Sequence, residues 1–374
     1  MMKRDRSPFI LVLNPGSSTL KHASYRGTEC IGEGTVECGE ADNSAAIGRL
    51  LSGSQWSAVA FRVVHGGNAL TAPTRVTDSV IETLEKTIPL APLHQPPALS
   101  AIRTVGALLP GIPRIACFDT AFHATLPEQE QRFAIADRYF QMGIRRYGFH
   151  GLSYESIASQ LPGISEQAAR RKTIVCHLGN GASLCGMDAC VSRYTSMGLT
   201  PIDGLIMGTR CGRIDVGVAI HWLREGMTAQ RIETIVTKES GLAALSEGTS
   251  DMRTLVERAP HDPRCELAIE MFCRSVAKEV SAAATAIGGL DCLVFTAGIG
   301  ENSSLVRQRV VALLAWLGGE IDADANQRRA TRLNTASSRF EILCIPTNEQ
   351  EVIARHAIRL LEDRLHEDIE LGNP

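Results

Sequence analysis

The chain has 374 residues, of which 44% are hydrophobic and 21% charged, and its formal net charge is −3. This is the composition of an ordinary globular protein that is long enough for two domains. Since there is no surplus of basic residues, we expect neither a nucleic acid nor an anionic membrane surface as a partner.

Apolar runs of strand length alternate along the chain with segments of helical periodicity, the pattern of an α/β fold. The predicted strands cover residues 9–13, 58–64, 113–118, 173–178, 183–187, 291–296 and 341–345. The predicted helices cover residues 97–109, 153–160, 228–238, 264–286, 304–317 and 350–364. No apolar run is long enough to span a bilayer, and the run after the basic start MMKRDRS is too short for a signal peptide, so we expect a cytoplasmic protein.

The first predicted strand runs into the polar sequence NPGSSTLK. Glycine, hydroxyl side chains and Lys21 after a strand suggest a phosphate loop. The common nucleotide-binding loop, however, needs a glycine before its lysine and a hydroxyl after it. Leu20 and His22 occupy these places, so a phosphate site of another kind is indicated.

Several segments of the chain share the same order of predicted strands, turns and helices. ILVLNPGSSTLKHASY and IVCHLGNGASLCGMDA each contain an apolar strand, a turn with Asn, Gly and Ser, and a second strand-like run. LDCLVFTAGIGENSSLVRQRV and EILCIPTNEQEVIARHAI each contain a strand, a polar loop and a helix. A duplicated α/β domain would place these loops at the carboxyl ends of strands, where open α/β sheets bind ligands.

Two glycine turns are candidate nucleotide contacts. Gly179-Asn180-Gly181 lies between two predicted strands, and Gly298 and Gly300 follow the strand 291–296. Small residues allow a phosphate to approach the backbone closely. Gly179–Gly181 could equally form a plain β-hairpin, and Gly298 and Gly300 a tight strand-to-helix turn. For each turn the structural and the nucleotide-binding interpretation both stay open.

Two arginines and two carboxylates are candidate active-site groups. Arg62 follows strand residues in FRVVHGG, and Arg210 lies in the glycine-rich polar loop MGTRCGRID. The planar guanidinium suits phosphate or carboxylate, although a single arginine is more often a salt-bridged surface group. Asp119 ends a strand and Glu349 precedes a helix, so each is a candidate helix cap or metal ligand. Single histidines are more often structural than catalytic, which applies to His94, His123, His150 and His177.

The 11 cysteines form no disulfide framework, and no Cys-x-x-Cys pair exists. Several, such as Cys117, Cys176 and Cys344, lie in apolar runs. We expect reduced, mostly buried thiols and no structural zinc site.

Ten blocks together carry a specific resemblance. In order they are NPGSSTLK, FRVVHGG, APLHQP, FDTAFHATLPE, RRYGFHGLS, HLGNGASL, TSMGLTPIDGLIMGTRCG, SGLAALSEGTSDMR, FTAGIGENS and IPTNE. From Phe9 to about Arg355 the chain resembles the acetate kinase family, the short-chain acyl kinases of the superfamily that also contains sugar kinases, heat-shock ATPases and actin.

The resemblance implies an α/β protein of two ribonuclease H-like domains with an active-site cleft between them. The two domains would be two copies of one βββαβαβα unit. Residues 1–119 with 350–374 would form the acyl-substrate side, and residues 120–349 the nucleotide side. It implies a homodimer that closes on its substrates. It also implies reversible, Mg²⁺-dependent transfer of the γ-phosphoryl group of ATP to acetate, giving acetyl phosphate and ADP, with Mn²⁺ as an alternative metal. A propionate or butyrate kinase of the same mechanism and a non-catalytic nucleotide-binding member remain alternatives.

The resemblance also implies roles for individual residues. The catalytic residues would be Asp119, Arg62, His150, Arg210 and Asn180. The acyl substrate would contact Arg62 and His94, with its methyl group in a pocket of Val64, Leu93, Phe149 and Pro201. The metal would be held by Asn14 and Glu349. ATP would contact Lys21, Ser17, Thr19, His177, Leu178, Gly179, Asn180, Gly181, Asp251, Met252, Arg253, Gly298, Ile299, Gly300, Glu301 and Asn302.

The chain also departs from the pattern of this family. Leu152 and Tyr154 stand where threonine and histidine are usual, and Arg213 and Val216 where aspartate and proline are usual. The segment 26–57 is shorter than in typical members. Val64 is bulky enough to favour a small acyl group, but one methylene in an apolar pocket is worth only about 1–3 kcal/mol. We therefore expect propionate to be a poorer substrate rather than an excluded one.

Overall fold

The computed structural model describes residues 7–16, 19–38, 43–53 and 55–370. The chain divides into two compact units: unit 1 comprises Met1–Ala124, His150–Ser156 and Asn348–Pro374, and unit 2 comprises Thr125–Phe149 and Ile157–Thr347. The domain division that the resemblance implies, 1–119 with 350–374 against 120–349, stays a prediction. The compact units differ from it mainly by grouping His150–Ser156 with the N-terminal part of the chain.

Unit 1 is built on a six-stranded sheet of order β3-β2-β1-β4-β6-β5. Its strands are β1 (Phe9–Pro15), β2 (Thr19–Arg26), β3 (Glu29–Glu37), β4 (Ala58–Val63), β5 (Thr74–Arg75) and β6 (Arg114–Phe118). The first three strands form an antiparallel meander, and β4 and β6 continue the sheet in parallel with β1.

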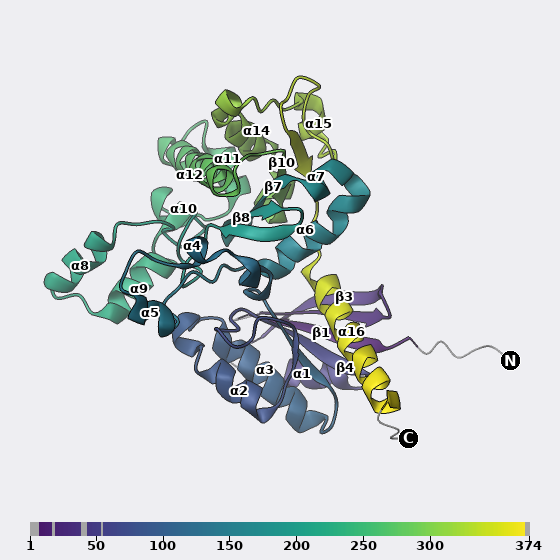
Figure 1. Ribbon diagram of the computed structural model, residues 1–374. Helices are drawn as coiled ribbons and strands as arrows, with labels where there is room; N and C mark the ends of the chain where they lie inside the picture. Colours follow the sequence, from purple (N-terminus) through teal and green to yellow (C-terminus); the bar gives the residue numbers. More distant parts are fainter. Residues whose placement is uncertain (1–6, 17–18, 39–42, 54, 371–374) are drawn as a thin grey trace. The chain divides into compact units, whose positions relative to one another are not determined.

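Helices cover both faces of the unit 1 sheet. Leu11 and Leu13 of β1 belong to one core cluster, packed with α1 (Ser44–Leu51), α2 (Asp78–Glu85) and α3 (Gln95–Leu108). Ile10 and Val12 belong to the other cluster, packed with α16 (Glu349–Glu370), which lies along the sheet in Figure 1. Because successive side chains of a strand point to opposite faces, the apolar run Phe9–Leu13 of β1 packs against helices on both sides of the sheet.

Unit 2 is also built on a mixed sheet with a similar strand order. Its five-stranded sheet has the order β11-β10-β7-β8-β9, again an antiparallel meander continued by two parallel strands. The strands are β7 (Lys172–Leu178), β8 (Ala182–Asp188), β9 (Val191–Thr195), β10 (Cys292–Thr296) and β11 (Glu341–Cys344). The predicted α/β fold is therefore confirmed, and the sequence similarity between the two halves corresponds to the same strand order in two sheets.

The longest helix of unit 2, α12 (Pro263–Ile287), packs against β7, β8 and β9 (Figure 1). The side chain of Asp262 caps its start, and Gly288, with a left-handed φ of 74°, ends it. Its buried stripe includes Phe272, Val276 and Val280, whereas Leu267 and Met271 of the same helix are exposed.

The remaining helices are shorter. They are η1 (Ile88–Leu90), η2 (Ala121–Thr125), α4 (Glu128–Gln131), α5 (Asp137–Gln141), α6 (Gly151–Ile164), α7 (Glu166–Arg170), α8 (Val216–Arg224), α9 (Ala229–Lys238), α10 (Gly241–Leu245), α11 (Met252–Arg258), α13 (Ala297–Asn302), α14 (Ser304–Leu313), η3 (Ala315–Leu317) and α15 (Ala323–Gln327).

Most predicted elements are present within a few residues. The prediction of one helix over 304–317 is wrong at its end, because α14 stops at Leu313 and a separate 3₁₀ turn follows. All 11 cysteines are free thiols, seven of them buried. Within the residues that the structure describes, no helix is both long and apolar enough to cross a membrane.

Candidate active site

The carboxyl edge of the unit 1 sheet brings three predicted residues together. Leu13 of β1 pairs in parallel with Phe61 of β4, so Asn14 and Arg62 occupy the next positions of neighbouring strands. The backbone N–H of Asp119, directly after β6, donates to the carbonyl of Val63 at 3.0 Å. Three segments far apart in sequence thus end side by side, at the edge where α/β sheets bind ligands.

Arg62 lies between two carboxylates. Its Nε and Nη2 donate to the two oxygens of Asp119 at 2.9 and 2.6 Å, and its Nη1 lies 3.5 Å from Oε2 of Glu349. The Asp119 side chain is 1% exposed, but that of Arg62 keeps 20% exposure and that of Glu349 17%. A cation held in a bidentate pair is rigid, and the Arg62 side chain is not fully covered by its partners.

Charge and burial act against each other at this pair. Burial raises the pKa of the Asp119 carboxyl, whereas the adjacent Arg62 and also His94 lower it. Burial lowers the pKa of Arg62, but Asp119 and Glu349 outweigh this effect and the pKa is raised overall. Arg62 is therefore a permanent cation.

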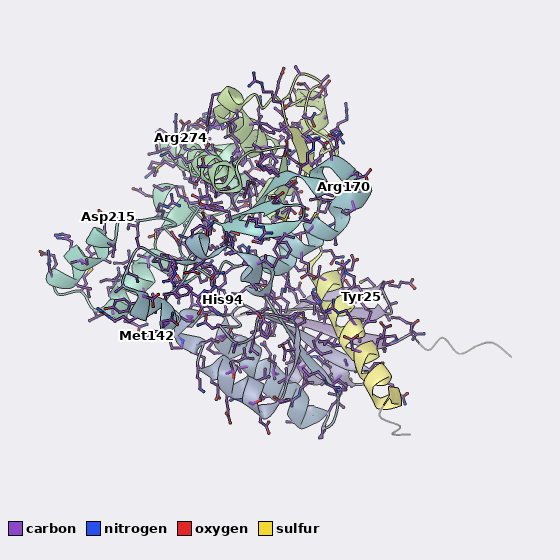
Figure 2. All side chains as sticks on the ribbon, in the orientation of Figure 1. Tyr25, His94, Met142, Arg170, Asp215 and Arg274 are labelled. Atoms are coloured by element: carbon purple, nitrogen blue, oxygen red, sulfur yellow. The ribbon has the colours of Figure 1, made fainter. Side chains whose placement is uncertain are left out.

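His94 and His150 belong to the same unit. His94 immediately precedes α3 (Figure 2) and is near enough to Asp119 to act on its pKa. His150 precedes α6 and has a left-handed φ of 58°, which is uncommon for a residue other than glycine. The next amide, that of Gly151, donates to the backbone carbonyl of Asp119 at 2.8 Å.

The predicted first phosphate loop also lies in unit 1. Asn14 and Lys21 are partners across β1 and β2, and the Gly16 amide donates to the Thr19 carbonyl at 2.7 Å. This places the predicted Lys21 and Thr19 on the strand that leaves the loop. The predicted Ser17 lies outside the described residues.

The residues predicted for the methyl pocket are divided between the units. Val64, half-buried after β4, and Leu93, 40% exposed, belong to unit 1. Phe149, which is fully buried, and Pro201 belong to unit 2. The pocket itself stays a prediction.

Arg210 is held by its own loop in unit 2. Its Nη1 donates to the carbonyl of Pro201 at 2.9 Å and lies 3.6 Å from Sδ of Met207. The Met207 amide in turn donates to the Arg210 carbonyl at 3.2 Å, which closes the loop. The prediction that Arg210 lies in a polar, glycine-rich loop is confirmed.

A cavity of about 640 Å³ in unit 2 collects much of the predicted ATP site. The predicted residues that line it are Gly179, Asn180, Asp251, Met252, Arg253, Gly298, Ile299 and Asn302. Sequence reasoning missed Ser250, Val256, Glu257, Ser303, Ser304 and Leu305. Helical spacing offered a signal for two of these, because Val256 and Glu257 follow Met252 and Arg253 by one turn of α11.

The first glycine turn, Gly179–Gly181, forms a β-hairpin between β7 and β8, as one interpretation of the sequence proposed. Leu178 pairs with Ala182, and the Gly179 amide donates to the Gly181 carbonyl at 3.1 Å. Asn180 is exposed at its tip, whereas the predicted His177 and Leu178 are buried in β7.

The other two predicted nucleotide segments are the starts of helices, and for Gly298 and Gly300 this is the tight strand-to-helix turn that the sequence left open. Residues 297–302 form α13, because Ala297, with a φ of 66°, turns the chain directly from β10 into a helix. The Glu301 carboxylate accepts from the Ala297 amide at 2.8 Å, and Gly300 is buried, so neither Glu301 nor Gly300 lines the cavity. Asp251 is the N-cap of α11 rather than a loop residue.

The donor set at the unit 1 edge suits a hard divalent cation. Asn14 supplies an amide oxygen, and Asp119 and Glu349 supply carboxylates, which are the ligands that Mg²⁺ and Mn²⁺ take. Within the described part of the chain, no group of three or more His, Cys, Asp or Glu side chains forms a metal cluster by itself. Metal binding by Asn14 and Glu349 stays a prediction.

Two solved structures that share this fold are an acetate kinase and a propionate kinase. An acetate kinase from Porphyromonas gingivalis matches with a TM-score of 0.86 and 32% identity, covering 95% of this chain and 100% of that one. A propionate kinase from Francisella tularensis matches with a TM-score of 0.86 and 34% identity, covering 93% of this chain and 98% of that one.

Sequence comparison defines the family. Residues 50–355 match the acetokinase family. The acetate kinase of Rhodopseudomonas palustris strain CGA009 is 49% identical over 310 residues, which are 82% of this chain and 77% of that protein. The acetate kinase of Halothermothrix orenii is 41% identical over 365 residues, 92% and 90% of the two chains. The chain belongs to the acetokinase family, and the resemblance seen in its ten blocks is confirmed.

Proposed function

We propose that this protein is an acetate kinase that transfers the γ-phosphoryl group of ATP to acetate, reversibly, giving acetyl phosphate and ADP. The observation that carries the proposal is the pair formed by Arg62 and Asp119, with Glu349 beside it, at the carboxyl edge of the unit 1 sheet. Membership of the acetokinase family supports the same reaction.

The reaction needs positioning and charge stabilisation more than acid–base chemistry. Acetate is already a carboxylate, so its oxygen attacks the γ-phosphorus without losing a proton, and the bond from that phosphorus to the β-phosphate oxygen breaks as ADP leaves. Arg62 is the permanent cation that would bind acetate or the transferring phosphoryl oxygens. Arg210, His150 and Asn180 would donate to the same oxygens as charge builds on them.

A divalent metal, Mg²⁺ or Mn²⁺, would be held by Asn14 and Glu349, with Asp119 near. It would neutralise charge on the phosphate oxygens of the nucleotide. In unit 2, the glycine hairpin and the first turns of α11 and α13 would bind ATP along the cavity that they line.

The proposed reaction requires the acyl and nucleotide groups to meet, so we propose that units 1 and 2 close on their substrates. Small-angle scattering with and without ADP, Mg²⁺, acetate and a planar phosphoryl mimic measures this directly. A smaller radius of gyration with the full set is expected. Identical profiles would contradict closure.

The assay that tests the function is ADP formation from ATP and Mg²⁺ with acetate, propionate and butyrate under identical conditions. The highest kcat/KM is expected for acetate. Arg62→Ala, purified in the same way, controls for contaminating kinases. ATP binding without turnover on any acid would favour a non-catalytic nucleotide-binding protein instead.

Propionate kinase is the second candidate, favoured by the similarity to the Francisella tularensis protein. Val64 is the residue in this chain that opposes it, because a bulky side chain leaves less room for a longer acid. A higher kcat/KM for propionate would keep the mechanism and overturn the acetate assignment.

We also propose a homodimer in the cytoplasm. No residue of α8 is buried, and three of its apolar side chains, Val216, Ile220 and Leu223, follow one another at helical spacing with exposures of 71%, 42% and 51%. Asp215, the N-cap of this helix, is labelled in Figure 2. An apolar face of this kind is typical of a subunit contact. Light scattering on Leu223→Asp, with Arg224→Gln as the control, should detect monomers in the first variant only.

A further inference from the structure

Two peptide groups connect the Asp119 segment with the His150 segment in unit 1. The Gly151 amide donates to the Asp119 carbonyl at 2.8 Å, and the Tyr154 amide donates to the His150 carbonyl at 3.1 Å. Asp119 therefore makes two different contacts: its side chain holds Arg62, and its backbone carbonyl holds the residue next to His150.

Only glycine fits at position 151. A Cβ added there would lie 2.1 Å from the Asp119 carbonyl oxygen and 2.9 Å from the Cβ of Phe122. Both contacts are shorter than van der Waals packing allows, and the first is with backbone. Any side chain at 151 must therefore push the two segments apart.

The backbone of His150 needs this support. A φ of 58° in a residue with a Cβ costs on the order of 1–2 kcal/mol. Such a conformation persists only where the surrounding structure holds it. Here the amide that follows His150 and the carbonyl of His150 itself are both hydrogen-bonded.

Aromatic rings pack the same two segments together. Tyr154, on the first turn of α6, is fully buried. Its ring centroid lies 5.5 Å from that of His123 and 6.5 Å from that of Phe122, both on η2 directly after Asp119.

We propose that Gly151 and Tyr154 are positioning residues that set the distance between the catalytic groups His150 and Arg62. Gly151 fixes His150 to the backbone of Asp119, whose side chain fixes Arg62. Tyr154 keeps the α6 turn against η2. The proposal rests on the proposed function in that His150 acts on the transferring phosphoryl group.

The main test compares two glycines of one helix. Gly151→Ala introduces the clash with Asp119, whereas Gly163→Ala, also in α6, places its Cβ in open space. Since a displacement of 1 Å near a reacting centre can cost about 100-fold in rate, Gly151→Ala should lose about 100-fold in kcat. Its KM for ATP should stay within about twofold of wild type, because the cavity proposed for ATP lies in unit 2. A kcat for Gly151→Ala equal to that of Gly163→Ala overturns the proposal.

Tyr154 supplies a second test should Gly151→Ala fold poorly. Tyr154→Leu removes the ring and should lower kcat about tenfold, while Tyr154→Phe keeps the ring and should restore most of it. Phe272→Leu is the control, because it removes a buried ring from α12 in unit 2. Equal kcat values for Tyr154→Leu and Phe272→Leu would count against a role for Tyr154.

A readout without turnover separates this proposal from the proposed function. The imidazole resonances of His150, assigned by their loss in His150→Asn, can be followed by NMR with pH. Gly151→Ala should shift them and Gly163→Ala should not. If the wild type phosphorylates no carboxylic acid but this difference appears, the proposed function fails and the positioning stands. Unchanged resonances in Gly151→Ala reject the positioning.

Discussion

The carboxyl edges of the two sheets carry different chemistry on the same strand order. In unit 1 the strand ends supply charged side chains, with Arg62 held between Asp119 and Glu349. In unit 2 the corresponding ends are a glycine hairpin after β7 and the short helix α13 after β10, and they line a cavity of about 640 Å³.

The difference follows from what each edge must provide. A partly buried cation is stabilised by carboxylate partners, so charges gather at the unit 1 edge. A cavity for a large anionic ligand needs backbone that side chains do not cover, so small residues gather at the unit 2 edge. Changes at the first edge should therefore affect turnover, and changes at the second should affect nucleotide affinity.

The largest expected effect is that of Arg62→Ala. It removes a cation from the transition state and leaves Asp119 buried without its partner, so kcat should fall about 1,000-fold while the KM for ATP changes little. Steady-state kinetics on both substrates measure this, with circular dichroism to check the fold. Arg210→Ala should also cost at least about 100-fold in kcat. Near-wild-type turnover in either variant would refute the role of that arginine.

Gly298→Leu, at the unit 2 edge, should weaken ATP binding rather than turnover. Nothing lies within 4 Å of a Cβ at this position, so the new side chain would extend into the cavity rather than disturb the core. The KM for ATP should rise about tenfold or more with kcat largely retained, as expected when uniform binding is lost. Gly32→Leu, in open space on β3, is the control. An unchanged KM would show that ATP does not use this cavity.

Val64→Ala should have a moderate effect on selectivity. Removing two methyl groups beside the Arg62 edge gives a longer acid more room, and the ratio of kcat/KM for propionate to that for acetate should rise about tenfold. Competition between the two acids measures this ratio directly. If the ratio does not move, the methyl group of acetate binds elsewhere.

The smallest effect is expected at the α11 cap in unit 2. Oδ2 of Asp251 accepts from the Thr254 hydroxyl at 2.8 Å, and its two oxygens accept from the amides of Arg253 and Thr254 at 3.3 Å. The Thr254 hydroxyl, followed by these amides, lowers the pKa of Asp251. Asp251→Ala should cost about 1 kcal/mol in the free energy of unfolding at neutral pH.

The lowered pKa also fixes the sign of the pH dependence. Since the folded pKa lies below the unfolded one, the charge of Asp251 stabilises the fold above about pH 4 and loses that effect as pH falls through the folded value. The stability gap between wild type and Asp251→Ala, measured by denaturant unfolding, should narrow below pH 4. Asp251→Asn keeps the cap without a charge, so its gap to Asp251→Ala should not change with pH.

Sequence reasoning reached the apolar strands β1, β4, β6, β7, β8, β10 and β11, the hairpin at Gly179 and the strand-end position of Asp119, because each depends on a few neighbouring residues. It did not predict β3, β5 or β9. For Gly298 and Gly300 it left open a tight strand-to-helix turn, which is confirmed, and Asp251–Arg253 also begins a helix. The reason is local: Ala297 adopts a left-handed φ, and a side chain from one turn later, that of Glu301, caps the helix. Elements as short as α1 and α2, with 8 residues each, give too few positions for a helical pattern to be recognised with certainty.

By itself the sequence determined the α/β pattern, the family and the residue types available for chemistry, because periodicity and motif order are properties of contiguous residues. Only the tertiary structure decided which of them meet. Arg62, Asp119 and Glu349 come from three distant segments, and strand order and register bring them to one edge. The cavity of unit 2 likewise needs the hairpin, α11 and α13 from three parts of the chain. Contacts of this kind depend on how strands pair over long separations, which no local pattern of residues specifies.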